Sequence, residues 1–278
     1  MTCPGVKETL RAELAIRPCV DPARGLIVLF TGSGGATWWT DQVPEAAGFA
    51  EDLGALGFWI IQVRWTQYWL TSSPGVDAGT AHMACRPATV IKYLHDTYYV
   101  PLGIPKQVGR AGFCVSGNSG GATQITYALS HYGLDDILDV VVPSSGPPHG
   151  ALAKSCLEKP GEEAYWFDLD TRQFIDTAFG YQDGNGPAAT LDATFTARWL
   201  EESQSTGGND YVHPTTRIHF IIGANDNPAI GKVSGDYSGR LIAEGSPQVT
   251  VEVAPNTPHR IMSSPEGRAA LWAAILDE

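Results

Sequence analysis

Short apolar runs alternate with amphipathic stretches along most of the chain. The apolar runs have the length of buried strands, and the stretches between them place apolar residues at helical spacing, as at Ala46, Phe49, Ala50 and Leu53. The expected strands cover 26–30, 58–65, 110–116, 137–145, 217–224 and 248–255. The expected helices cover 42–56, 87–99, 121–133 and 267–278, and the segment 225–247 is expected to be a helix-poor loop. This alternation predicts a mostly parallel sheet with helices on both faces.

The alternation breaks after the strand that ends near Ser145. Residues 146–215 read as loops with two short helices, near 171–180 and 190–203, and they carry several aromatic residues. We interpret 146–215 as a lid or cap inserted into a single domain that spans 1–278. The alternative is a helical decoration that packs on the sheet without gating anything.

The stretch "CVSGNSGGAT" contains the pattern G-x-S-x-G, from Gly117 to Gly121. It follows an apolar strand directly and opens a helix directly, which is the setting that a nucleophilic serine requires. Ser119 must sit on a sharp turn, and side chains at Gly117 or Gly121 would collide with the neighbouring backbone. The N–H of Gly120, at the start of the helix, could then face a developing oxyanion.

With this motif the chain resembles the α/β-hydrolase superfamily, in particular its serine esterases and lipases, from about Leu26 to the C-terminus. The resemblance implies the order nucleophile, acid, histidine. Asp226, three residues after Gly223 in "HFIIGANDNP", is in the place of the acid, and His259 in "VTVEVAPNTPHR" is in the place of the histidine. In this interpretation Ser119 attacks, His259 transfers the proton, and Asp226 orients His259.

A second glycine-rich turn, "TGSGG" at 31–35, follows the first predicted strand. It lacks the lysine of a phosphate-binding P-loop, and Thr37 stands where a dinucleotide-binding loop needs its third glycine. The resemblance implies an oxyanion-hole donor here instead, although the family commonly has His-Gly where this chain has Thr31-Gly32. The donor is the backbone N–H of Ser33, with Gly34 as the alternative.

Aromatic residues crowd the loops that follow the first two predicted strands. Trp38, Trp39, Trp65 and Trp69 could wall an apolar or aromatic acyl pocket, because loops at the carboxyl ends of parallel strands line the ligand crevice. We therefore expect these tryptophans to bind substrate, together with Gly34 and Asn118. Ordinary packing is the alternative for the tryptophans. Arg64 could anchor a substrate carboxylate or pair with an acidic neighbour.

Charge and hydropathy narrow the possible partners. The formal net charge is −12 and the pI is near 4.9, which disfavours nucleic acid. No apolar stretch approaches the roughly 20 residues of a membrane span, and the start of the chain as given shows no signal peptide. A secreted mature form and a cytoplasmic protein both fit this sequence, and it leaves the oligomeric state open.

The five cysteines show no C-x-x-C spacing, so the sequence predicts no metal site. Cys114 lies in a strand pattern and is expected to be a buried thiol. The pairs Cys3–Cys19 and Cys85–Cys156 are candidate disulfides, and free thiols throughout fit equally well.

Together these features predict a serine hydrolase without metal or cofactor that acts on small-molecule or polymeric esters. A peptidase or amidase, a thioesterase and a lactonase with the same three residues remain close alternatives. A lyase and a non-catalytic binding protein on the same scaffold are the alternatives from other classes.

Overall fold

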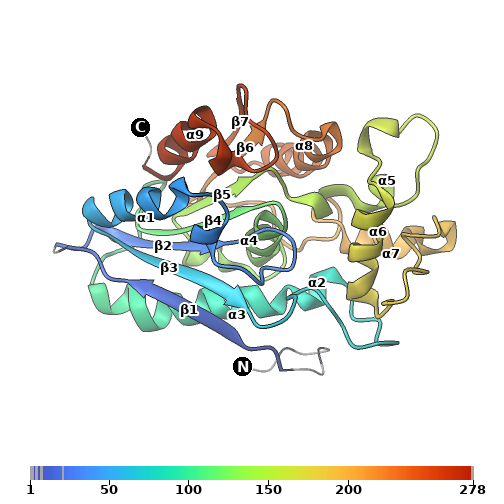
Figure 1. The fold of residues 1–278 in the computed structure, drawn as a ribbon, viewed down its shortest axis with the longest axis horizontal. Coiled ribbons are helices and arrows are strands. Elements are labelled where there is room, and N and C mark those ends of the chain that lie inside the picture. Colours follow the sequence, from blue (N-terminus) through green and yellow to red (C-terminus); the bar gives the residue numbers. More distant parts are fainter. Residues whose placement is uncertain (1–2, 4–5, 7–8, 21, 277–278) are drawn as a thin grey trace.

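The computed structural model describes residues 3, 6, 9–20 and 22–276. Its centre is a seven-stranded sheet in the order β1-β3-β2-β4-β5-β6-β7 (Figure 1). The edge strand β1 runs antiparallel to β3, and every other neighbouring pair is parallel. The strands are β1 Ala12–Arg17, β2 Gly25–Phe30, β3 Phe58–Trp65, β4 Phe113–Asn118, β5 Val140–Ser144, β6 Arg217–Gly223 and β7 Val249–Ala254.

Helices cover both faces of the sheet, as the sequence predicts. Helices α1 and α9 contribute Phe49 and Leu271 to the hydrophobic core on one face. Helices α3, α4 and α8 contribute Ile91, Ile125 and Val233 to the larger core on the other face. The helices are α1 Glu45–Ala55, α2 Thr80–Met83, α3 Cys85–Leu94, α4 Gly120–Ser130, α5 Leu152–Ser155, α6 Leu169–Asp176, α7 Thr196–Glu202, α8 Pro228–Ala243 and α9 Pro265–Leu276.

Strand β2 shows how the apolar runs build this arrangement. Leu26, Val28 and Phe30 face one core, while Ile27 and Leu29 face the other. All five side chains are fully buried, because successive side chains of a strand point to opposite faces and both faces are covered. A central parallel strand therefore reads as a continuous apolar run.

The two longest elements that the sequence analysis did not predict are α8 and β1, and the short helices α2 and α5 were not predicted either. The expected helix-poor loop is wrong, because α8 fills Pro228–Ala243. Its buried face includes Val233, Tyr237 and Leu241 at helical spacing, but the glycines and serines between them conceal the period. Strand β1 is the other addition, and its only partly buried side chains leave little apolar signal.

The segment 146–215 contains short helices, of which α6 and α7 lie close to the two predicted ones. Figure 1 shows α5, α6 and α7 gathered beyond one end of the sheet. The segment has an aromatic centre of its own, in which Phe179, Phe195 and Trp199 meet with ring centroids 4.8–5.4 Å apart. Its role as a lid stays a prediction.

A disulfide joins Cys3 to Cys85, so both candidate pairings from the sequence are wrong. Folding places Cys3 beside the first residue of α3, whereas Cys156 belongs to the inserted segment and is fully buried. Cys114 is a buried thiol, as expected. None of the helices in the described part of the chain is long and apolar enough to cross a membrane.

Candidate active site

Ser119 lies at the turn between β4 and α4, with φ 56° and ψ −118°. A non-glycine residue rarely adopts a positive φ, and holding one there costs on the order of 1–3 kcal/mol. The Ser119 N–H donates to the carbonyl of Ser144 on β5 at 2.8 Å. The side chain of Ser119 is partly exposed at the end of the sheet.

The two flanking glycines are required by close backbone contacts. A Cβ on Gly117 would lie 2.4 Å from the carbonyl carbon of Gly121, where the strand and the helix meet. A Cβ on Gly121 would lie 2.6 Å from the carbonyl oxygen of Phe30 on β2. Neither contact can be relieved by moving a flexible side chain. The steric reason that the sequence analysis gave for these glycines is confirmed.

Asp226 and His259 form a hydrogen-bonded pair in the loops after β6 and β7. His259 Nδ1 lies 2.8 Å from Asp226 Oδ1, which also accepts the Asn227 N–H at 2.7 Å. The Asp226 side chain is 1% exposed, while that of His259 is 46% exposed. A proton on Nδ1 is therefore held towards a buried carboxylate, which leaves Nε2 as the basic nitrogen of the ring.

Backbone contacts join the loops that carry these residues. The Asn225 N–H donates to the carbonyl of Thr257 at 2.9 Å, and a Cβ on Gly223 would lie 2.4 Å from the same oxygen. The buried side chain of Asn118, which precedes Ser119, accepts the Ile261 N–H at 3.2 Å through Oδ1. Asn118 thus holds the histidine loop against the serine turn.

The "TGSGG" turn packs directly on the serine turn. A Cβ on Gly120 would lie 2.2 Å from the carbonyl oxygen of Ser33 and 2.8 Å from its nitrogen. Ser33 has a φ of 49°. Among the described residues, neither the N–H of Ser33 nor that of Gly120 is taken by a backbone acceptor. The two expected oxyanion donors are therefore neighbours in space, although 87 positions separate their numbers.

The remaining glycines of this turn make room for side chains from the loop after β3. A Cβ on Gly34 would lie 2.1 Å from the Tyr68 ring, and one on Gly35 would lie 2.6 Å from the Trp65 ring. The carbonyls of Gly34 and Gly35 accept the N–H groups of Trp69 and Trp65 at 3.1 and 2.9 Å. The absence of side chains at Gly34 and Gly35 is therefore required by packing, whatever role this turn has in catalysis.

A cavity of about 330 Å³ lies over Ser119 and His259. Three of the residues that the sequence analysis assigned to the site, Asn118, Gly34 and Ser33, line it. Tyr68, from the aromatic loop after β3 that the sequence analysis considered as a pocket wall, also lines it, whereas sequence reasoning missed Gln42 and Arg260. Arg260 donates to the carbonyl of Gln42 at 2.8 Å, and its position next to His259 in the sequence was the one available signal.

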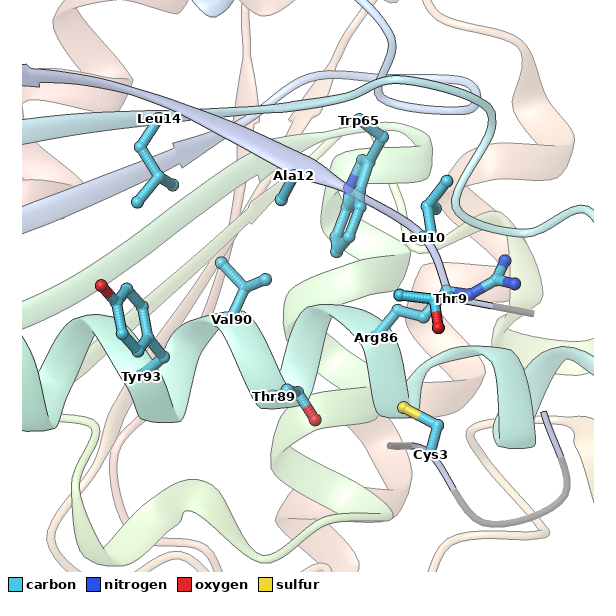
Figure 2. A pocket seen from close by; sticks show the side chains of 10 residues that line it. All are labelled: Cys3, Thr9, Leu10, Ala12, Leu14, Trp65, Arg86, Thr89, Val90 and Tyr93. Carbon is cyan, nitrogen blue, oxygen red and sulfur yellow. The ribbon is translucent and has the colours of Figure 1, made fainter. Parts of the chain in front are cut away.

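The expected wall of tryptophans is not found at this cavity. Trp39, Trp65 and Trp69 are at most 2% exposed and belong to the two hydrophobic cores. Trp65 points between β1 and α3 into a different cavity, of about 200 Å³ (Figure 2). Its indole N–H donates to Gln124 at 2.7 Å. Packing places these rings in the cores because burial of their large apolar area stabilises the fold.

The half-buried Trp38 carries the guanidinium of Arg64 at 4.4 Å from its ring centre. Arg64 also pairs with Glu13 on β1, and this arginine holds the pKa of the Glu13 carboxyl below its usual range. The pairing with an acidic neighbour, one of the two expected roles of Arg64, is confirmed.

Comparison with known proteins supports the fold. No family model matches the chain, and no curated protein matches its sequence. Among solved structures, Est1E from Butyrivibrio proteoclasticus is similar with a TM-score of 0.57 at 12% identity, covering 96% of this chain and 95% of Est1E. A bacterial heroin esterase is similar with a TM-score of 0.56 at 17% identity, covering 99% of this chain and 84% of the esterase.

The mouse alpha/beta hydrolase domain-containing protein 10 is a third similar structure, with a TM-score of 0.53 at 11% identity, covering 97% of this chain and 94% of the mouse protein. At these identities the similarity concerns the fold. The chain has the fold of the α/β-hydrolase superfamily, as the sequence predicts.

Proposed function

We propose that this protein is a serine hydrolase that cleaves carboxylic esters through an acyl-enzyme intermediate. The observation that carries the proposal is that one cavity contains both Ser119, on its strained turn, and His259, which is hydrogen-bonded to the buried Asp226. A serine hydroxyl is a weak nucleophile near neutral pH and needs a base within reach. A histidine with its other nitrogen held by a carboxylate is suited to that task.

The reaction has two balanced halves. Ser119 Oγ attacks the ester carbonyl while His259 Nε2 takes its proton, and the tetrahedral intermediate expels the alcohol as His259 returns the proton to the leaving oxygen. Water then attacks the acyl-Ser119 carbonyl, again deprotonated by His259. The acid leaves, and Ser119 regains its proton. Asp226 stabilises the imidazolium that forms in each half.

The N–H groups of Gly120 and Ser33 would bind the oxyanion, with Gly34 as the alternative to Ser33. The close approach of Ser33 to Gly120 supports this assignment, as does the position of Gly120 at the N-terminus of α4. One such donor contributes roughly 3 kcal/mol of transition-state stabilisation.

The cavity favours esters with small or aromatic acyl groups. Its volume of about 330 Å³ is at the lower end of the range for ligand pockets. Tyr68, 49% exposed, offers an aromatic face, and its ring packs against Phe174 of the inserted segment at 5.8 Å between centroids. Est1E, one of the similar structures, is also known with ferulic acid bound. We expect butyryl and benzoyl esters to be cleaved faster than palmitoyl esters.

The decisive experiment combines covalent labelling with turnover. A fluorophosphonate probe should label the wild-type protein once, at Ser119, and Ser119→Ala should lose both labelling and hydrolysis of p-nitrophenyl butyrate. Ser263→Ala is a matched control, because this exposed serine lies four positions from His259. An unlabelled, folded wild-type protein would favour the non-catalytic binding protein.

A substrate panel separates the related hydrolases. p-Nitrophenyl esters, peptide amides, thioesters and lactones are compared by kcat/KM at equal protein concentration. The proposal requires esters to be preferred over peptide amides. A preference for one of the other three classes would reassign the same three residues to a peptidase, thioesterase or lactonase.

A further inference from the structure

His213 is a buried histidine whose ring lacks a hydrogen bond within the part of the chain that the structure describes. Its side chain is 0% exposed, and among the described residues neither Nδ1 nor Nε2 has a hydrogen-bond partner. Its backbone is firmly held, because its N–H donates to Ser246 Oγ at 2.9 Å. A buried polar group without a partner costs about 1–3 kcal/mol, so the orientation of this ring calls for a physical reason.

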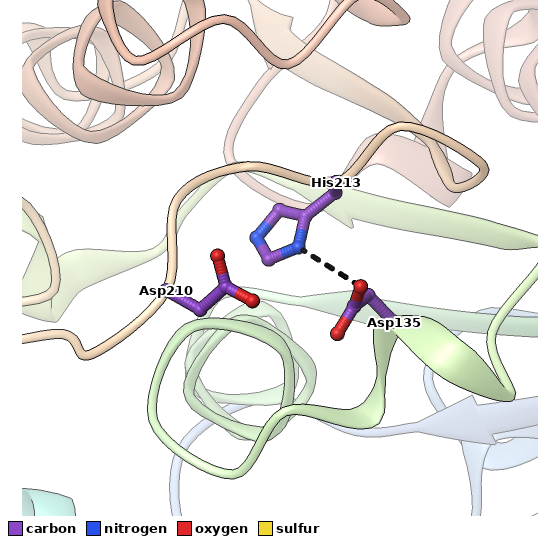
Figure 3. A group of neighbouring side chains, drawn as sticks. All are labelled: Asp135, Asp210 and His213. Atoms are coloured by element: carbon purple, nitrogen blue, oxygen red, sulfur yellow. Dashed lines mark ion pairs between the residues drawn. The ribbon is translucent and has the colours of Figure 1, made fainter.

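Two carboxylates face the His213 ring, as Figure 3 shows. Asp135 comes from the turn between α4 and β5, and Asp210 comes from the segment that returns the insertion to β6. One ligand atom from each of the three side chains lies within 4.8 Å of the others. Asp135 is 17% exposed and Asp210 is half-buried, so the group is reachable from solvent on the carboxylate side.

The spacing differs from that of a direct hydrogen bond. His213 Nδ1 lies 3.9 Å from Asp135 Oδ2. In two other histidine–carboxylate pairs of this protein the ring nitrogen is closer to the oxygen: His259 Nδ1 lies 2.8 Å from Asp226 Oδ1, and His219 Nε2 lies 3.0 Å from Glu252 Oε2. In a tetrahedral zinc site, two ligand atoms each about 2.1 Å from the metal are about 3.4 Å apart. The observed distance therefore leaves room for an ion between the two groups.

We propose that Asp135, Asp210 and His213 bind one Zn²⁺ ion, with water as the fourth ligand. An imidazole nitrogen and two carboxylate oxygens suit Zn²⁺, whereas Ca²⁺ and Mg²⁺ prefer oxygen alone. The two carboxylates balance the charge of the ion. Asp210 keeps an oxygen for the metal, because its Oδ1 accepts the Val212 N–H at 2.9 Å and Oδ2 remains. The Lys106 ammonium contacts the backbone oxygen of Asp135 rather than its carboxylate.

The ion would stabilise the fold without taking part in ester hydrolysis. Ser119 precedes α4 and Asp135 follows it, so the two sites lie at opposite ends of a helix that is about 16 Å long by its 11 residues. A metal here would tie the end of the 146–215 insertion to the turn between α4 and β5. Its loss would loosen that end of the insertion.

Zinc binding is tested on the full chain after dialysis against a chelator. Titration calorimetry should show one Zn²⁺ per chain, and Zn²⁺ should raise the Tm while Ca²⁺ and Mg²⁺ do not. Asp135→Asn and Asp210→Asn should each weaken Zn²⁺ binding more than about tenfold, the loss typical even for groups that only orient a ligand. Asp136→Asn is the matched control, since this exposed neighbour of Asp135 is outside the group and should bind Zn²⁺ as the wild type does.

Cobalt provides a second readout that does not depend on a thermal shift. Co²⁺ in the site should give visible absorption bands of tetrahedral N/O coordination, and His213→Asn should abolish them in protein whose circular dichroism is unchanged. Absence of Zn²⁺ binding by the folded wild type overturns the proposal. Equal affinity in Asp135→Asn, Asp210→Asn and Asp136→Asn overturns it as well.

Discussion

Replacing Gly120 by alanine tests the expected oxyanion hole most directly. The added Cβ would lie 2.2 Å from the carbonyl oxygen of Ser33. Ordinary van der Waals contact begins near 3.4 Å, so the Ser33 backbone must retreat by about 1.2 Å. Oxyanion donors act within about 2.7–3.1 Å of the oxygen, and a shift of this size removes one of them.

The expected loss for Gly120→Ala is about 10²–10³-fold in kcat, or about 2.7–4 kcal/mol. The assay is hydrolysis of p-nitrophenyl butyrate, with the free energy of unfolding measured in urea to exclude a general loss of structure. Gly235→Ala is the control, since a Cβ there meets nothing within 4 Å on the exposed side of α8. It should keep full activity and stabilise the helix by roughly 0.5–1 kcal/mol.

A second variant with a smaller steric conflict provides a comparison in case Gly120→Ala does not fold. In Gly32→Ala the new Cβ would be 3.2 Å from the Asn118 oxygen and 3.3 Å from Ser119 Cβ, which is a milder conflict. Gly32→Ala should therefore lose less activity than Gly120→Ala. Wild-type kcat in a folded Gly120→Ala protein would refute the reasoning that Gly120 and Ser33 jointly hold the oxyanion.

Three further predictions concern the supports of the site and the fold. Asn118→Ala leaves the Ile261 N–H unpaired, so it should lower the free energy of unfolding in urea by about 1–3 kcal/mol. It should also lower kcat more than it changes KM, and an unchanged kcat would contradict a positioning role for Asn118. Burial lowers the pKa of His149 to about 3, so the unfolded chain binds its proton first as pH falls below about 6.5. The stability that neutral His149 contributes is complete above that pH, and it should fall by about 2 kcal/mol by pH 5. In urea unfolding, the free energy of unfolding of His149→Gln should therefore decrease between pH 7 and pH 5 by about 2 kcal/mol less than that of the wild type. Cys3→Ser opens a loop closed over 82 residues and should lower the free energy of unfolding by about 4 kcal/mol; equal stability of oxidised and reduced wild type would argue against that estimate.

Local patterns in the sequence determined most of the sheet and the candidate catalytic residues. Strand β3 has the predicted bounds, because its apolar run is buried on both faces and carries its own signal. The serine turn was equally visible, because the pattern G-x-S-x-G lies in one continuous strand–turn–helix segment, although only the contact of Gly117 with Gly121 falls within that segment and Gly121 itself meets the backbone of β2. Asp226 and His259 could be proposed because the resemblance to the α/β-hydrolase superfamily implies an acid and a histidine after two of the recognised strands.

Tertiary structure alone decided where the tryptophans lie and what pairs with what. The sequence pattern of an apolar ring is the same whether the ring lines a substrate pocket or packs in a core. Only the packing of β1 against β3 and α3 placed Trp65 in the core. The disulfide between Cys3 and Cys85 and the group formed by Asp135, Asp210 and His213 join segments far apart in the chain. Such contacts depend on how distant elements pack, and no local period encodes them.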